Sequence, residues 1–294
     1  KTRKQKRQAE EKKIAKAGGT PRYPGWEELR AEAREEKPTV ILTISDEDGH
    51  IVRRLNAPAS AGIHRVTWNL RYPSSNPVTL SAANRRGFGG GGSGPMAAPG
   101  TYRVSMALRV DGQTTPLGNT QSITTEALGT AALPAADRQA LLTFQRKTAR
   151  LLRAVLGAGR AVSEAQNRLE HIRKALENTP EAPPELLQRT VSLDSQLKDL
   201  LIKLTGDPII RAHNAPRPPS ITGRVRGIVS GHWSSTSAPT QTHREQYEIA
   251  ATEFEQLLPQ LQKMIEQDLE QLEAELEKAG APHTPGRVPR WHRE

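Results

Sequence analysis

Hydrophobic residues recur at alternating steps of three and four along most of the second half of the chain. From residue 141 to 176 this step is held for about five heptads, the spacing of an apolar seam on one long helix. Similar stripes run over 186–204 and 247–276, and Pro259 is expected to kink the last helix because its ring clashes with the preceding turn. The expected inward positions are Leu141, Phe144, Thr148, Leu151, Val155, Ala158, Val162, Ala165, Leu169, Ile172 and Leu176, then Leu186, Thr190, Leu193, Leu197, Leu200 and Leu204, and finally Tyr247, Ala251, Phe254, Leu258, Leu261, Ile265, Leu269, Leu272 and Leu276.

Three long amphipathic helices can hide their stripes only against one another. With a short fourth helix that begins after Ser220, they predict an antiparallel helical bundle over residues 128–281. A heptad seam could instead mediate dimerisation. The proline-rich links are long enough for an antiparallel return, which favours the intramolecular bundle. Residues 282–294 are expected to form a loose basic tail.

The pattern changes to period two between residues 38 and 127. Apolar and polar residues alternate over 40–44, 51–55, 63–70 and 101–110, and a return strand is expected over 116–124. Asp111-Gly112 is a strong hairpin signal. Short strands with turn residues between them predict an immunoglobulin-like β-sandwich over 38–127.

The predicted sandwich has an expected inward face in its third strand and a long loop after it. In the third predicted strand, Val66, Trp68 and Leu70 share one face and are expected to point inward. A glycine-rich loop over 78–98, with Phe88 in its low-complexity tract, is expected to be flexible. The whole chain is therefore predicted to be α+β and multidomain, with a small sandwich followed by the helical bundle.

Residues 1–37 form a charged helical segment in front of the sandwich. Helices are expected over 1–17 and over 26–36, and eight Lys and Arg against two Glu in the first sixteen residues account for much of the formal charge of +10. The basic helix could bind phosphates, or it could simply be a solvated charged face. It lacks the interleaved aromatic residues of single-strand readers, which argues against nucleic acid as a partner.

Length and composition narrow the remaining choices. The 294 residues suffice for about two domains. The absence of cysteine excludes disulfides, thiolate catalysis and cysteine-zinc sites, and no apolar run approaches the roughly 20 residues of a membrane span. The N-terminus does not look like a signal peptide, and a start at Lys1 inside a predicted helix indicates a fragment or a processed piece.

Three segments resemble the C-terminal region of bacterial sortilin-like (Vps10-type) proteins with BNR repeats, which are often labelled glycosyl hydrolases. They are VRRL at 52–55, GIHRVTWNLRY at 62–72 and PGTYRV at 99–104, and the resemblance extends over about 20–280. It implies two upstream β-propellers, a sandwich of the type in the flagellar hook-capping protein, a helical region, and a secreted or periplasmic location. It also places the first sandwich strand before Lys1, so that a partner chain or upstream portion would complete the sandwich.

The acidic residues do not form a recognisable catalytic pair. Glu266, Glu270, Glu273 and Glu277 have the spacing of a solvated helix face rather than of two acids that converge in a cleft. The run Asp46-Glu47-Asp48 could bind calcium, but a turn explains it more simply, since no twelve-residue calcium loop follows.

Other chemistry-bearing residues have structural explanations too. The eight histidines are dispersed: His50, His64, His171, His213, His232, His243, His283 and His292. There is no G-x-S-x-G elbow, and the glycine-rich tract lacks the phosphate-loop spacing. Trp68 could stack on a sugar, but a core position is favoured. Tyr23, Trp26 and Trp233 lie at element edges, where aromatic residues often dock domains. No catalytic, cofactor-binding or metal-binding residue is predicted.

The sequence thus predicts a non-catalytic structural and protein-interaction module, the C-terminal part of a secreted propeller protein. Its expected partner is the upstream β-propeller portion or another protein chain, through which a glycan could be bound. One alternative is an accessory region of a glycan-acting hydrolase whose active site lies in the propellers. Another is a basic nucleic-acid-binding protein.

Overall fold

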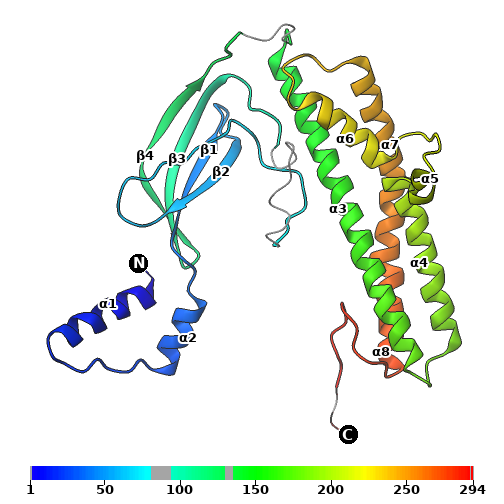
Figure 1. The fold of residues 1–294 in the computed structure, drawn as a ribbon, viewed down its shortest axis with the longest axis horizontal. Coiled ribbons are helices and arrows are strands. Elements are labelled where there is room, and N and C mark those ends of the chain that lie inside the picture. Colours follow the sequence, from blue (N-terminus) through cyan, green and yellow to red (C-terminus); the bar gives the residue numbers. More distant parts are fainter. Residues whose placement is uncertain (1, 81–93, 130–134, 292, 294) are drawn as a thin grey trace. The chain divides into compact units, whose positions relative to one another are not determined.

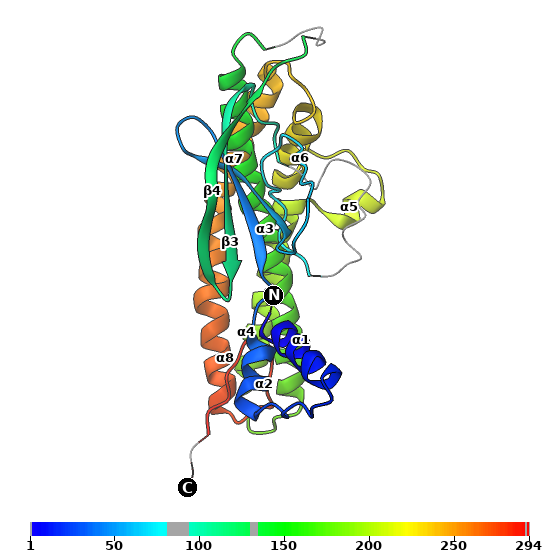
Figure 2. The same cartoon turned by 90° about the vertical axis from the view of Figure 1, so that its left-hand side faces the viewer.

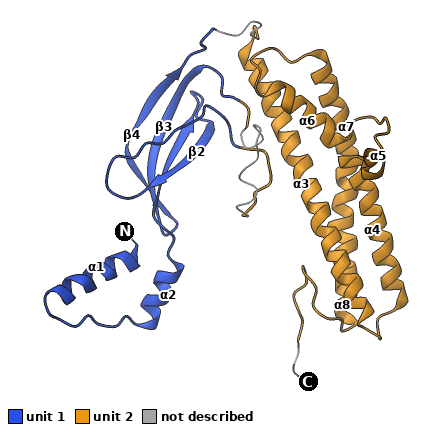
Figure 3. Cartoon of the chain, viewed as in Figure 1, with its two compact units in different colours: residues 1–73, 96–130 blue, residues 74–95, 131–294 orange. Residues whose placement is uncertain are grey.

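A computed structural model describes residues 2–80, 94–129, 135–291 and 293. The chain contains both α-helices and a β-sheet, as the sequence predicts. It divides into two compact units, residues 1–73 with 96–130 and residues 74–95 with 131–294 (Figure 3). We call them the sheet unit and the helical unit. Residues 81–93 of the predicted glycine-rich loop, Phe88 among them, lie outside the described residues.

The sheet unit begins with two helices held by charged contacts. Helix α1 (Arg3–Lys16) has no buried residue, and α2 (Trp26–Arg34) ends slightly before its predicted boundary. Arg7 of α1 bonds both carboxylate oxygens of Glu32 on α2, at 2.5 and 2.8 Å. This ion pair substitutes for an apolar contact that the sequence of α1 cannot supply.

Four antiparallel strands form the sheet, in the order β2-β1-β3-β4 (Figure 1). They are β1 (Thr39–Ser45), β2 (Ile51–Pro58), β3 (Gly100–Val110) and β4 (Gln113–Thr125). Asp111 and Gly112 both have positive φ, at 50° and 79°. That conformation gives a two-residue hairpin a twist that matches its strands. The hairpin predicted from Asp111-Gly112 is confirmed.

The register gathers the apolar residues on one face of the sheet. Leu42 lies between Leu55 and Met106, and Val40 lies between Ala57 and Leu108. The alternate residues of β1 and β3 place mainly threonine, serine and arginine on the opposite face, together with Ile41 and Ala107. The sheet is therefore amphipathic.

The strand predicted over 63–70 is not formed. No residue from 63 to 70 pairs with a strand. Arg71, just after this stretch, makes an isolated bridge to Met96, and Leu70 has a φ of 55°, which lies outside strand geometry. The indole of Trp68 donates to the carbonyl of Arg71 at 3.1 Å, which turns the chain locally. The inward orientation predicted for Leu70 is wrong, since its side chain is exposed, whereas Trp68 packs beside Ile44, Val52 and Tyr102.

The helical unit consists of α3 (Arg138–Glu177), α4 (Pro184–Thr205), α5 (Pro208–Ala212), α6 (Ile221–His232), α7 (Gln241–Lys263), the π-helical turn η2 (Met264–Asp268) and α8 (Leu269–Lys278). Helix α4 returns alongside α3, and α5 lies at the outer side of this unit (Figures 1 and 2). One aliphatic core joins the long helices and α6. All predicted inward residues of α3 and α4 are buried except Leu151, which is partly buried.

In the last helix Phe254 and Leu261 are buried as predicted, but at three positions the buried residue lies one place before the predicted one. Ala250, Leu257 and Met264 are buried, while the predicted Ala251, Leu258 and Ile265 are only partly buried. The helix continues through Pro259, and η2 then inserts a wider turn. A π turn spans one more residue than an α turn, so it brings Leu269 into line behind Met264.

The C-terminal tail contacts the helices at several points up to Arg290, contacts that the sequence did not predict. Arg287 donates to the Glu277 carboxylate of α8 and to the carbonyl of Pro282 at 3.0 Å. Gly286 has a φ of 95°, and a Cβ built on it would lie 2.6 Å from Nε of Arg168 on α3. The pairing of Arg287 with Glu277 and the close approach of Gly286 to Arg168 hold the tail against the helices.

Candidate functional site

The acidic residues of η2 and α8 are not the uniformly solvated face that the sequence predicts. Glu266 and Glu270 are exposed, but Glu273 is buried and accepts two bonds from Arg168, at 2.8 and 2.6 Å. Hydrogen bonding to Arg287 lowers the pKa of Glu277. These two carboxylates hold helices and tail together, and each is occupied by a guanidinium.

The turn Asp46–His50 places Asp48 and His50 near Asp46, so that their ligand atoms lie within 4.8 Å of one another. Asp48 and His50 are exposed, and Asp46 accepts the backbone N–H of His50 at 2.8 Å. That bond is an ordinary device of a turn. The geometry accords with the turn interpretation of Asp46 and Asp48.

Two histidines that belong to no recognisable sequence motif lie close together in the helical unit. The ring centroids of His232 on α6 and His243 on α7 lie 5.2 Å apart. Phe144 of α3 packs edge-on against His232, with 5.6 Å between the ring centroids. Nε2 of His232 lies 3.2 Å from the carbonyl of Ser237, while its Nδ1 is buried and has no hydrogen-bond partner. Because a carbonyl only accepts, Nε2 carries a proton and donates it to Ser237, whereas a second proton on the buried Nδ1 would find no acceptor.

We expect the buried His232 to make the helical unit sensitive to acid. Burial lowers its pKa below 6.5, and the nearby His243 and Arg244 act in the same direction; Lys147 adds further positive charge beside Phe144. Below about pH 6.5 the unfolded chain takes up a proton that the folded state resists, so stability falls with pH by at most about 1.4 kcal/mol per unit. Urea unfolding at several pH values should show this slope in the native chain and lose it in His232→Gln. The exposed His171→Gln is the control, and an unchanged slope in His232→Gln would contradict the assignment.

The aromatic residues differ in their surroundings. Trp68 packs edge-on against Tyr102, with ring centroids 5.1 Å apart, and burial raises the pKa of Tyr102 to about 12. Trp68 thus packs against the small core, as the favoured interpretation predicts in part, but it is only partly buried and does not lie on a strand. Trp233 is buried, whereas Tyr23 and Trp26 are 76% and 72% exposed.

The apolar face of the sheet is buried at one end only. Ile44, Val52 and Tyr102 are covered by Trp68, Tyr72 and neighbouring apolar residues. Towards the other end Met106 is 42% exposed, and Val40, Leu42 and Leu108 are partly exposed. An apolar sheet face with incomplete cover is a surface suited to protein contact.

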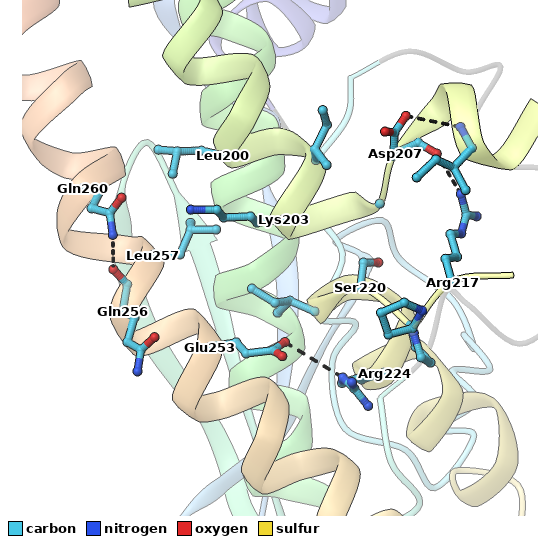
Figure 4. A pocket seen from close by; sticks show the side chains of 16 residues that line it. Leu200, Lys203, Asp207, Arg217, Ser220, Arg224, Glu253, Gln256, Leu257 and Gln260 are labelled. Atoms are coloured by element: carbon cyan, nitrogen blue, oxygen red, sulfur yellow. Dashed lines mark hydrogen bonds and ion pairs between the residues drawn. The ribbon is translucent and has the colours of Figure 1, made fainter. Parts of the chain in front are cut away.

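A cleft of about 460 Å³ opens in the helical unit, between the end of α4, the link that carries α5, the start of α6 and the middle of α7 (Figure 4). Leu200 and Leu257 line its inner part, while Lys203, Arg217 and Arg224 bring positive charge. Figure 4 shows Arg224 facing Glu253 of α7, with their nearest atoms 3.9 Å apart.

Neither this cleft nor the short helix α5 is among the features predicted from the sequence. A signal was present: Asp207 followed by Pro208 is a helix start, and the Asp207 carboxylate accepts the N–H of Ile209 at 2.7 Å. The resulting α5 shapes the outer wall.

None of the described helices has the length and apolar character needed to cross a membrane. No family model, curated protein or solved structure matches the chain.

Proposed function

We propose that this chain is a non-catalytic module that supports or assembles with another protein portion. In this proposal the sheet is one layer of an immunoglobulin-like sandwich, and the long helices are an antiparallel bundle. The resemblance described above makes an upstream β-propeller portion of a secreted or periplasmic bacterial protein the expected partner. The incompletely covered apolar face of the sheet carries the proposal.

The exposed end of this face favours contact with protein. Each square ångström of apolar surface removed from water contributes about 25 cal/mol, so covering Met106 and its neighbours would stabilise an assembly. The opposite face carries mainly Thr, Ser and Arg, although Ile41 and Ala107 also lie on it, and Ser105, next to Met106 on β3, is exposed. The face of Met106 is therefore the more apolar of the two and the one that favours a partner layer.

The edge strand β4 supports the same proposal. It pairs with β3 alone, is thirteen residues long, and contains no charged residue. Exposed edges are usually protected by charged side chains, since their free N–H and C=O groups can pair with another strand. Pro116 interrupts the donors of β4 at one position only.

The test is assembly of this chain with the natural upstream portion. We expect co-purification and a higher thermal midpoint for the mixture than for this chain alone. Met106→Glu should abolish the gain, because it would bury a charge at the contact. Ser105→Glu places the same charge on the polar face of the same strand and should leave assembly intact.

Several results would contradict the proposal. They are a native gene without a propeller portion, equal assembly by the two variants, or turnover of a glycan by this chain alone.

A further inference from the structure

We propose that the cleft shown in Figure 4 binds an extended segment of a partner protein in which an aliphatic side chain lies next to a carboxylate. The inference is independent of the proposed function, because it rests on the helical unit and not on the sheet. Two observations point to this occupant: the apolar lining of the cleft, and two cations, Lys203 and Arg217, that form no ion pair among the described residues.

The cleft has a buried apolar floor, and exposed isoleucines surround it. Leu200, Ile221 and Leu257 are buried in the floor. At the rim Ile202 and Ile210 are 40% and 37% exposed, and the adjacent Ile209 on α5 is 68% exposed. Single exposed aliphatic residues are ordinary, but a group around a cleft marks a binding surface.

The cleft has the size for side chains of a peptide. Ligand sites in proteins usually enclose about 300–1,000 Å³, and this cleft lies in that range. Pro218 and Pro219 form part of one wall, with Gln256 and Gln260 on the α7 side. Proline fixes the backbone of its wall, so a rigid surface is available before binding.

Two arginines at the cleft differ in whether they form an ion pair. Arg224 is nearly buried; it donates to Gln246 at 2.7 Å and lies 3.9 Å from Glu253. Arg217 donates to the backbone carbonyl of Asp207 at 2.7 Å and makes no ion pair among the described residues. The carboxylate of Asp207 is engaged at the start of α5 instead.

Lys203 likewise forms no ion pair in the described part of the chain. The cleft lining holds three cations, Lys203, Arg217 and Arg224, against the two carboxylates of Asp207 and Glu253, so a positive charge remains in excess. An anionic group of a ligand would pair with Lys203 and Arg217. Charge-assisted bonds of this kind are the stronger hydrogen bonds, and guanidinium matches a carboxylate through two parallel bonds.

The lining distinguishes a protein segment from a nucleic acid. No aromatic side chain lines the cleft, so it offers no platform on which a base could stack. The side-chain amides of Gln256 and Gln260 can exchange hydrogen bonds with an extended backbone. The aliphatic floor, the glutamine amides on one wall and the cations without an ion pair together fit an acidic peptide.

The experiment selects binders for the intact chain from a displayed library of short random peptides. We expect enriched peptides to carry Asp, Glu or a free C-terminal carboxylate beside Leu, Ile or Val. The double variant Lys203→Glu with Arg217→Glu should weaken their binding at least about tenfold, as loss of complementary charge does. The matched control is Lys198→Glu with Arg160→Glu, which reverses two exposed charges away from the cleft.

Circular dichroism and the thermal midpoint verify that each variant is folded. Met106→Glu should leave peptide binding unchanged, which separates this inference from the proposal for the sheet. The inference is overturned if no peptide is enriched, if enriched peptides lack an acidic group, or if both double variants bind equally. Binding of a labelled single-stranded DNA that depends on Lys203 and Arg217 would also overturn it.

Discussion

Leu204→Ala is expected to lower the free energy of unfolding of the helical unit by about 3–4 kcal/mol. Leu204 is 0% exposed in the last turn of α4. A Cβ built on Gly159 of α3 would lie 3.8 Å from its Cδ2, so the two helices already approach closely at this point. A fully buried leucine leaves a cavity that packed neighbours fill only in part, which places the cost near the middle of the range for leucine truncation.

The matched control is Leu187→Ala, on the same helix. Its side chain is 41% exposed, so the same truncation should cost less than about 1 kcal/mol. Urea unfolding followed by far-UV circular dichroism reports on the helical unit, which contains most of the helix. Similar losses in the two variants would show that Leu204 is not in a closed core.

Helical periodicity was the most informative signal because each long stripe is decided locally. A residue that recurs every three or four positions reaches the same face whatever the rest of the chain does. That is why the buried residues of α4 agree with the prediction one by one. The shift in α7 has a different origin: the extra residue of η2 adjusts the phase between Met264 and Leu269, and no propensity in the sequence announces such a turn.

The errors arise where distant residues decide the structure. Charge spacing predicts a solvated face for Glu273, but Arg168 lies 105 residues earlier in the chain and pairs with it. The alternation over 63–70 is typical of a strand, yet Trp68 packs on Tyr102 and bonds locally instead. Tertiary contact overrides local propensity in both cases.

The candidate sites illustrate the same limit. The pairing of His232 with His243 and the cleft behind Arg217 both require α6 and α7 to lie side by side, which no motif in the sequence encodes. The hairpin at Asp111-Gly112 could be predicted because its chemistry is contained in two residues. Sites assembled from several helices have no comparable local signature.

The second large effect concerns the ion pair that joins α3 to α8. Arg168 and Glu273 form two parallel bonds, with 23% and 8% of their side chains exposed. Glu273→Leu keeps much of the volume but leaves the arginine without a carboxylate, and Gly286 closes over its guanidinium. Breaking one side of a buried pair costs about 3–5 kcal/mol; because Arg168 retains some contact with water, we expect about 3 kcal/mol.

The same urea experiment measures this loss, and it has two controls. Glu270→Leu changes an exposed acid of α8 and should alter stability by no more than about 0.5 kcal/mol. The double variant Arg168→Met with Glu273→Leu removes both charges and should recover most of the loss, because apolar residues of similar size often replace a buried pair without cost. A double variant less stable than Glu273→Leu would mean that the tail, through Gly286, depends on the arginine itself rather than on the balance of buried charge.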